Sequence, residues 1–220
     1  MQKKIGLLFD MDGVMVLNHH YHIEAYCTWA ARYGYTITEQ LFNERLTGKT
    51  MYSAILELTP ELLEKETPEF YEEEKESLYR ELYKHKMAAT PGLIDFLESA
   101  KQNNIPIACG SNAYMKNIDF ILDGLSLRKY FSAAISGTEV AKPKPSPDVY
   151  LEAAKKIGVL PENCVVFEDS LTGVQAAKAA GMKVVGVASS FSHEELSHTD
   201  FIINDFTEID IQKIRTFFDG

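Results

Sequence analysis

The sequence predicts an α/β fold in which a doubly wound parallel sheet carries an inserted α-helical cap domain, and this prediction rests on three observations. Short apolar runs without period-two alternation recur along the chain, which is typical of strands buried on both faces of a sheet. Helical patterns lie between the later runs, and strands that alternate with helices indicate parallel pairing through crossovers. One long stretch near the N-terminus interrupts the alternation and shows helical periodicity only.

The predicted strands are the six short apolar runs at residues 5–9, 105–109, 133–135, 165–167, 184–188 and 201–203. The predicted helices of the same region cover residues 92–101, 114–122, 147–157 and 171–180. Gly181 follows the last of these helices, at the position where a C-terminus favours a residue that accepts a positive φ. Each helix therefore connects two neighbouring strands and packs on the sheet.

The interruption covers residues 18–87 and is predicted to form the cap domain, while residues 1–17 and 88–220 form the catalytic core. The stretch has amphipathic helical patterns and no convincing buried strand. Because it follows the first strand directly, we expect a small lid-like domain that is joined to the core by two linkers. Its acidic run at residues 72–76 is predicted to be a solvated helix face.

Composition excludes several classes of partner. The chain has 22 Lys and Arg against 32 Asp and Glu, a net charge of -10, which disfavours nucleic acid and anionic membranes. A small phosphorylated metabolite remains compatible, because a metal and a few local cations can reverse the field in one cleft. The first apolar run is too short for a signal peptide, so we expect a soluble, cytoplasmic protein. Nothing in the sequence fixes its oligomeric state.

The residues that follow the predicted strands belong together, because ligands of an open parallel sheet bind beyond the carboxyl ends of its strands. Four of these ends are polar. They read Asp10-Met11-Asp12-Gly13, Gly110-Ser111-Asn112, Lys142-Pro143-Lys144 and Glu168-Asp169-Ser170. The set combines acids, a hydroxyl and a lysine, which is what anchoring Mg²⁺ and a phosphoryl group requires.

The pair Asp10 and Asp12 comes directly after the first predicted strand. Such a pair also suits two turn carboxylates, but here Gly13 follows and can supply a turn that brings the backbone close to a ligand. Asp10 is then a candidate carboxylate nucleophile. Asp12 is a candidate for protonating the leaving group and later deprotonating water. A metal on Asp10 would keep that carboxylate ionised.

The other strand ends each have a structural interpretation beside the functional one. Ser111 and Asn112 precede a predicted helix, so on their own they favour an N-cap, although a helix N-terminus is also a phosphate site. Lys144 suits a solvated turn, or a place beside the phosphate where its charge offsets the phosphoryl oxygens. Glu168 and Asp169 suit helix capping or hard oxygen ligands for Mg²⁺.

Together the four motifs resemble the haloacid dehalogenase superfamily, in its branch with a helical cap inserted after the first strand. FDMDGV resembles the first motif of the family, CGSNA the second, KPSPDVYL the third and FEDSLTGVQAAKAAG the fourth, so the resemblance covers nearly the whole chain. It implies a Rossmann-like core with Mg²⁺ as the cofactor. Dehalogenases lack the second aspartate of the first motif, and since Asp12 is present, phosphoryl transfer is favoured.

The resemblance also implies a role for each matching residue. It assigns Asp10 as nucleophile, Asp12 as acid and base, Ser111 to phosphate binding, and Lys144 to both nucleophile and phosphate. Asn112 is a further candidate for phosphate binding, because it precedes the same predicted helix as Ser111. It implies that Asp10, Asp169 and the Asp12 backbone carbonyl hold Mg²⁺, with Glu168 as a further ligand. Lys142 is the alternative to Lys144, although the pattern KPxPD aligns Lys144.

Within the family, the sequence resembles β-phosphoglucomutase, including YHIEAY at the start of the cap. The resemblance makes the histidine of this segment, His22, a candidate substrate-binding residue. The mutase binds the distal phosphate of its substrate through an arginine three residues after the glycine that matches Gly48, where this chain has Met51. Lys49 is the remaining candidate, but an ammonium does not replace a bidentate guanidinium. The sequence therefore predicts a phosphatase for a small phosphorylated metabolite, a sugar phosphate, with the mutase as alternative. A non-catalytic phospho-receiver domain is a remote alternative, because its phospho-acceptor follows the third strand.

Overall fold

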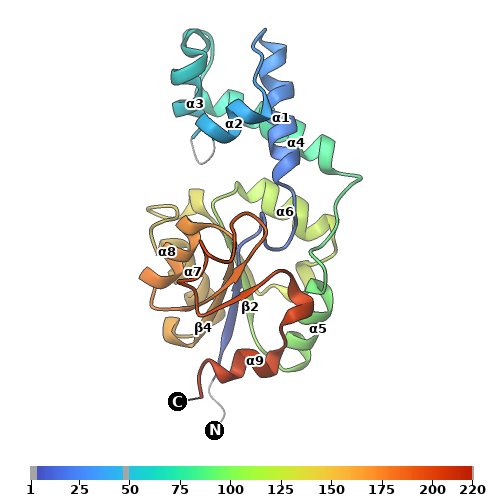
Figure 1. Cartoon of the computed structure of the whole chain (residues 1–220), viewed down its shortest axis with the longest axis vertical. Coiled ribbons are helices and arrows are strands. Elements are labelled where there is room, and N and C mark those ends of the chain that lie inside the picture. The colour runs from blue at the N-terminus through green and yellow to red at the C-terminus, as the bar shows by residue number, and fades with distance from the viewer. Residues whose placement is uncertain (1–3, 47–49, 220) are drawn as a thin grey trace. The chain divides into compact units, whose positions relative to one another are not determined.

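The computed structural model describes residues 4–46 and 50–219, and the chain divides into two compact units. The larger unit combines Met1–Leu17 with Met87–Gly220, and the smaller unit is Asn18–Lys86. Figure 1 shows the larger unit as a sheet flanked by helices and the smaller unit as a group of helices.

The larger unit contains a six-stranded parallel sheet with the order β3-β2-β1-β4-β5-β6. Its strands are β1 (Gly6–Phe9), β2 (Ile107–Ser111), β3 (Ala133–Ser136), β4 (Cys164–Glu168), β5 (Lys183–Val187) and β6 (Phe201–Ile203). The predicted doubly wound parallel sheet is confirmed. Its strand order reverses at β1, which pairs with β2 on one side and with β4 on the other. In such sheets the ligand crevice lies at this switch point, beyond the carboxyl ends of the strands.

The helices of the larger unit are α5 (Leu93–Gln102), α6 (Met115–Gly124), α7 (Asp148–Ile157), α8 (Leu171–Ala179) and α9 (Ile211–Thr216). Short 3-10 turns lie at Arg128–Tyr130, Gly137–Glu139, Pro161–Asn163 and Phe206–Glu208. Gly181 has a φ of 75°, as predicted for the end of α8. Pro147 was predicted as the first residue of α7, but it is the N-cap, because the helix begins at Asp148.

The two faces of the sheet bury different side chains, because successive residues of a strand point to opposite faces. Leu8 and Val166 pack in the cluster that includes residues of α7 and α8. Phe9 and Phe167 stack with ring centroids 4.6 Å apart, and both contact Phe96 of α5. The same alternation sets the face of the sheet toward which the side chains directly after β1 and β4 point.

The smaller unit consists of α1 (His19–Arg32), α2 (Glu39–Arg45), α3 (Met51–Leu58), the 3-10 turn Pro60–Glu64 and α4 (Pro68–Tyr83). Residues 18–46 and 50–86 of this unit contain no strand. The aromatic core of the unit is built around Trp29, whose ring contacts Tyr26, Tyr33 and Tyr71. Apolar packing of an amphipathic face, rather than helix propensity, stabilises such short helices.

The acidic run of α4 is not one solvated face. Glu76 is only 6% exposed and forms an ion pair with Lys75. Successive helical residues are rotated by about 100°, so a run of five charged residues passes around the helix and one of them meets the core. The prediction of a solvated face was therefore wrong at Glu76.

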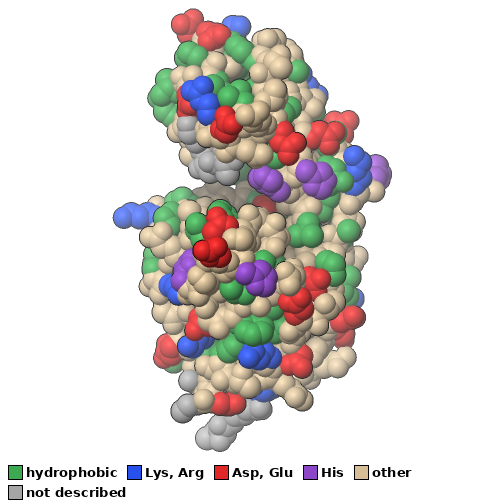
Figure 2. All heavy atoms as spheres, in the orientation of Figure 1, with side chains coloured by type: hydrophobic (Ala, Val, Ile, Leu, Met, Phe, Trp, Pro, Cys, Tyr) green, Lys and Arg blue, Asp and Glu red, His purple; other side chains and the backbone are tan. Residues whose placement is uncertain are grey.

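Charged side chains of both signs are interspersed on the face of the larger unit drawn in Figure 2, and they form no single-sign field there. Across the described ranges, no helix combines the length and the apolar composition that a bilayer crossing needs. Cys109 and Cys164 are buried free thiols, and Cys27 is a half-buried one.

Candidate active site

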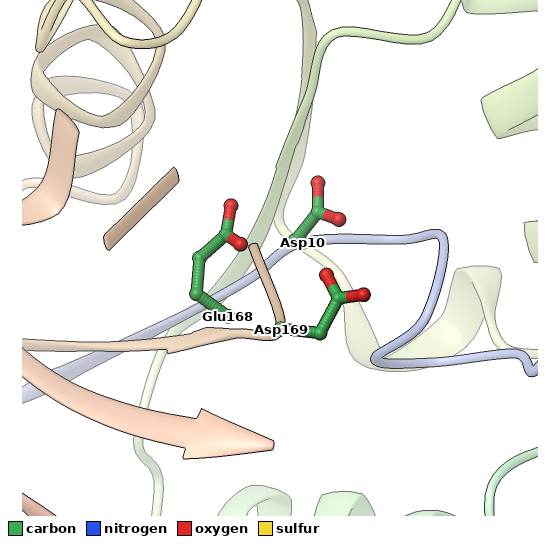
Figure 3. A group of neighbouring side chains, drawn as sticks. All are labelled: Asp10, Glu168 and Asp169. Carbon is green, nitrogen blue, oxygen red and sulfur yellow. The ribbon is translucent and has the colours of Figure 1, made fainter. Parts of the chain in front are cut away.

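Three buried carboxylates meet at the switch point of the sheet. Asp10 follows β1, while Glu168 ends β4 and Asp169 follows it, and Figure 3 shows their side chains projecting from these two neighbouring strands. One oxygen from each lies within 4.8 Å of the others. Phe9 is in register with Phe167, and the backbone N–H of Asp10 donates to the Phe167 carbonyl over 3.0 Å. Strand pairing therefore brings together acids that are far apart in the sequence.

Lys144 supplies the positive charge of this group. Its Nζ lies 2.7 Å from Asp10 Oδ1 and 2.7 Å from Glu168 Oε1, and its side chain is only 4% exposed. Lys142, the alternative in the same loop, is exposed. The structure thus brings Lys144, and not Lys142, to the carboxylates.

Asn112 holds the loop that carries Lys144. Its Oδ1 accepts a hydrogen bond from the Lys144 backbone N–H at 3.0 Å, and its Nδ2 donates to the Lys144 carbonyl at 3.3 Å. Ser111 ends β2 with 2% exposure, and its Oγ accepts from the Ala113 N–H. Neither residue caps α6, whose N-cap is Tyr114, so the N-cap interpretation of this pair was wrong.

The turn after β1 fits closely against Asp169. Gly13 has a φ of 79°, and a Cβ at this position would lie 2.0 Å from Asp169 Oδ2. A side chain here would therefore be strained and would also displace the carboxylate. Asp12 lies within this turn and is half-buried.

Two serines after β5 were missed by sequence reasoning. The hydroxyl of Ser190 donates to Asp169 Oδ2, and the hydroxyl of Ser189 donates to the Gly13 carbonyl at 2.5 Å. These two hydrogen bonds connect the Asp169 carboxylate and the turn at Gly13 to the residues that follow β5. These serines directly follow the predicted strand 184–188. The rule that ligands bind beyond the carboxyl ends of the strands would therefore have selected them, had it been applied to this strand as well.

The carboxylates carry more negative charge than Lys144 offsets. Burial raises the pKa of Asp10 to about 7, and the charges of Glu168 and Asp12 act in the same direction, while Lys144 opposes them. Burial likewise raises the pKa of Asp169 well above its usual range. Burial alone would lower the pKa of Lys144, but the charges of Asp10 and Glu168 raise it, so the ammonium stays protonated. A divalent cation with a preference for oxygen would balance this set, and the donors fit Mg²⁺.

The elevated pKa of Asp10 predicts how Mg²⁺ should stabilise the protein. The unfolded carboxyl loses its proton near pH 4 and the folded one near pH 7, so Asp10 contributes stability at low pH that is lost as pH rises toward 7. Mg²⁺ must displace a proton at pH 6 but not at pH 8, so it should raise the melting temperature more at pH 8. Thermal melts with and without Mg²⁺ at both values, at constant ionic strength, measure the difference.

Asp169→Ala is the matched variant for this experiment, because it removes one oxygen ligand and should reduce the Mg²⁺-dependent rise in melting temperature at both pH values. An equal rise at pH 6 and pH 8 would contradict the expected competition between proton and metal.

The remaining predicted site residues belong to the smaller unit. His22 stacks on Tyr79 with ring centroids 3.8 Å apart, and its Nε2 is 3.4 Å from Asn18 Nδ2. Lys49 lies outside the described residues. Met51 is 4% exposed, and its Sδ accepts from the Tyr26 hydroxyl at 3.9 Å. Position 51 is therefore part of the apolar core of this unit.

An open parallel sheet whose first and fourth strands end in a buried acidic group with a lysine defines an α/β enzyme with its site at the switch point. The chain belongs to the haloacid dehalogenase-like hydrolase family, whose sequence pattern matches residues 7–187. The resemblance of the four motifs to this superfamily is therefore confirmed.

Two relatives with named activities are similar over most of their length. The phosphorylated carbohydrates phosphatase of Thermotoga maritima is 35% identical over 192 residues, which cover 85% of this chain and 87% of the relative. The fructose-1-phosphate phosphatase YqaB of Escherichia coli is 33% identical over 188 residues, covering 84% and 97%.

Solved structures show the same fold. The crystal structure of CbbY from Rhodobacter sphaeroides in complex with xylulose-(1,5)bisphosphate has a TM-score of 0.85 at 25% identity and covers 96% of this chain and 99% of that one. The β-phosphoglucomutase (pgmB) of Clostridium difficile has a TM-score of 0.80 at 26% identity, covering 99% and 100%.

Proposed function

We propose that this protein is a Mg²⁺-dependent phosphatase that hydrolyses a small phosphorylated metabolite through an aspartyl-phosphate intermediate on Asp10. The class of metabolite that we propose is a sugar phosphate. The observation that carries the proposal is the buried Lys144 ammonium, which lies 2.7 Å from both Asp10 and Glu168 beside Asp169. The phosphatases among its relatives support the reaction class, and two of them are named for phosphorylated carbohydrates or fructose 1-phosphate.

In the first step the free carboxylate oxygen of Asp10 attacks phosphorus. A bond forms between this oxygen and phosphorus, and the bond from phosphorus to the ester oxygen breaks. The leaving alcohol takes a proton from Asp12, two residues along the turn. Lys144 stays on Asp10 Oδ1 and offsets the negative charge that gathers on the phosphoryl oxygens.

In the second step water attacks phosphorus and Asp12 takes its proton. The acyl phosphate bond breaks, which releases inorganic phosphate and returns Asp10 to its carboxylate form. Asp10, Asp169 and the Asp12 carbonyl would hold Mg²⁺, and when bound the ion supplies the charge that keeps Asp10 ionised and orients the phosphoryl oxygens.

Glu168 has a different task in this proposal. Its Oε1 accepts from Lys144 and Tyr150, and its Oε2 accepts from the Ser170 backbone and hydroxyl. Because both oxygens already accept two donors, Glu168 suits the anchoring of Lys144 better than direct ligation of Mg²⁺.

A sugar-phosphate mutase is the second candidate, favoured by the similarity to a solved β-phosphoglucomutase. A mutase must hold the distal phosphate of its substrate so that transfer back to sugar outruns attack by water. The buried, uncharged Met51 supports the phosphatase, since it contributes no charge to that task.

The product ratio separates the two candidates. We expect the enzyme, assayed with Mg²⁺ on sugar 1-phosphates, sugar 6-phosphates and phosphoglycolate, to release inorganic phosphate from at least one of them. With β-glucose 1-phosphate and its bisphosphate activator, inorganic phosphate should form in excess over glucose 6-phosphate. A large excess of glucose 6-phosphate would reject the phosphatase in favour of the mutase, and full turnover after chelation would remove the metal from the proposal.

A further inference from the structure

Tyr150 contacts both members of the Lys144–Glu168 ion pair, yet it has no part in the steps above. It lies on α7 and is fully buried. Its hydroxyl donates to Glu168 Oε1 at 2.7 Å, and its ring centroid is 4.6 Å from Lys144 Nζ. A cation this close to an aromatic ring is attracted by the ring, and more strongly where water is excluded.

The Glu168 carboxylate is fixed by its neighbours. Ser170 donates to Oε2 through its N–H at 3.0 Å and its hydroxyl at 2.9 Å. On the other side a Cβ at Gly173 would lie 1.6 Å from Oε1, so the carboxylate fills the space that this glycine leaves. The two donors on Oε1, from Lys144 and Tyr150, therefore share one oxygen whose position is set by this packing and by the bonds to Ser170.

The Tyr150 ring is held as firmly. A Cβ at Gly110 of β2 would lie 3.2 Å from two ring carbons, so the ring packs directly on the strand backbone. Burial raises the pKa of the Tyr150 hydroxyl well above its usual range, and the charge of Glu168 acts in the same direction. The hydroxyl therefore keeps its proton and remains a donor.

We propose that Tyr150 is a positioning residue for Lys144, and the inference rests on the proposed phosphoryl transfer. By donating to Glu168 Oε1, the hydroxyl satisfies part of the hydrogen-bonding capacity of that carboxylate. The Lys144 ammonium then stays shared between Glu168 and Asp10 and directs charge at the phosphoryl group. Without this donor, Glu168 would draw the Lys144 ammonium away from Asp10. The ammonium would then offset less of the negative charge that forms on the phosphoryl group in the transition state.

Tyr150→Phe tests the proposal, because it keeps the ring, its packing on Gly110 and its contact with Lys144. A hydrogen bond to a charged group is strong enough for its loss to lower kcat about tenfold. KM should stay within about twofold, because the interaction matters mainly in the transition state. The matched control is Tyr130→Phe, a buried tyrosine of the same unit outside the site, which should keep the wild-type kcat.

A double-mutant cycle separates positioning from a merely structural role. In a Glu168→Gln background, Tyr150→Phe should change kcat by less than about threefold, because the effect passes through Glu168. An equal loss in both backgrounds would reject that route. Replacing Tyr150 with 4-aminophenylalanine restores a donor and should recover part of the lost kcat. If Tyr150→Phe does not fold, 4-fluorophenylalanine fills the para position without a donor and should show the same loss.

The outcomes distinguish this inference from the proposed function. If the wild type releases no phosphate from any ester, or if Lys144→Met keeps full turnover, the proposed function fails. If the wild type is active and Lys144→Met is not, but Tyr150→Phe has wild-type kcat and KM, only the positioning role of Tyr150 is rejected.

Discussion

Asp10→Asn is expected to lower turnover by at least about 10³-fold while the protein stays folded, as found for other enzymes that lose their nucleophile. An amide keeps the shape of the side chain and its place beside Lys144, but it cannot form an acyl phosphate. Phosphate release under saturating substrate and Mg²⁺ measures the loss, and a thermal melt shows that the fold is retained.

Asp119→Asn is the matched control for this change, because Asp119 lies on α6 with its side chain 47% exposed and pairs with Arg128 at the surface. It should keep full activity. Full activity in well-folded Asp10→Asn protein would overturn the covalent mechanism, and incubation with substrate followed by acid quenching should trap a phosphorylated protein only when Asp10 is present.

Lys144→Met is expected to abolish detectable turnover and also to destabilise the fold by about 3–5 kcal/mol, because it leaves buried charges without their partner. The Lys144 ammonium forms ion pairs with both Asp10 and Glu168, whose side chains are 11% and 0% exposed. Chemical denaturation at pH 8 without metal measures the change. The destabilisation should shrink below pH 7, where Asp10 takes up a proton.

Lys142→Met provides the control from the same loop. Lys142 is exposed, so the substitution should change stability by no more than about 0.5 kcal/mol and leave turnover intact. Equal effects of the two substitutions would contradict the placement of Lys144 at the carboxylates and reopen the choice between the two lysines.

The strands of the sheet were predicted correctly from the sequence, because burial on both faces of a strand produces a short apolar run that is visible locally. The predicted runs 5–9 and 201–203 match β1 and β6 to within one residue. The predicted helix 171–180 matches α8 to within one residue, because helical periodicity is also a local signal. Errors arose where a single residue decides a boundary, as at Pro147 and Tyr114, since cap geometry depends on the loop that precedes the helix.

Part of the candidate site was predicted from the sequence. The rule that ligands lie beyond the strand ends selected Asp10, Lys144, Glu168 and Asp169, which the structure brings together, and their chemical roles stay predictions. Asn112 was selected for the phosphate, and this role stays a prediction, while the structure shows its amide bonded to the backbone of Lys144. Tyr150 was not selected at all, because an aromatic residue in a helix has the same pattern whether it packs in a core or donates to a buried carboxylate.

By itself the sequence determined the strands, the helices between them and the acidic strand ends, since these follow from periodicity and local backbone preference. Only the tertiary structure decided that β1 lies beside β4, that Lys144 contacts both Asp10 and Glu168, and that Tyr150 and Ser190 join them. The physical reason is that a hydrogen bond requires two atoms within about 3 Å in a fixed direction. Residues from different motifs meet that condition only once the strand order and the alternation of faces have set where each side chain points.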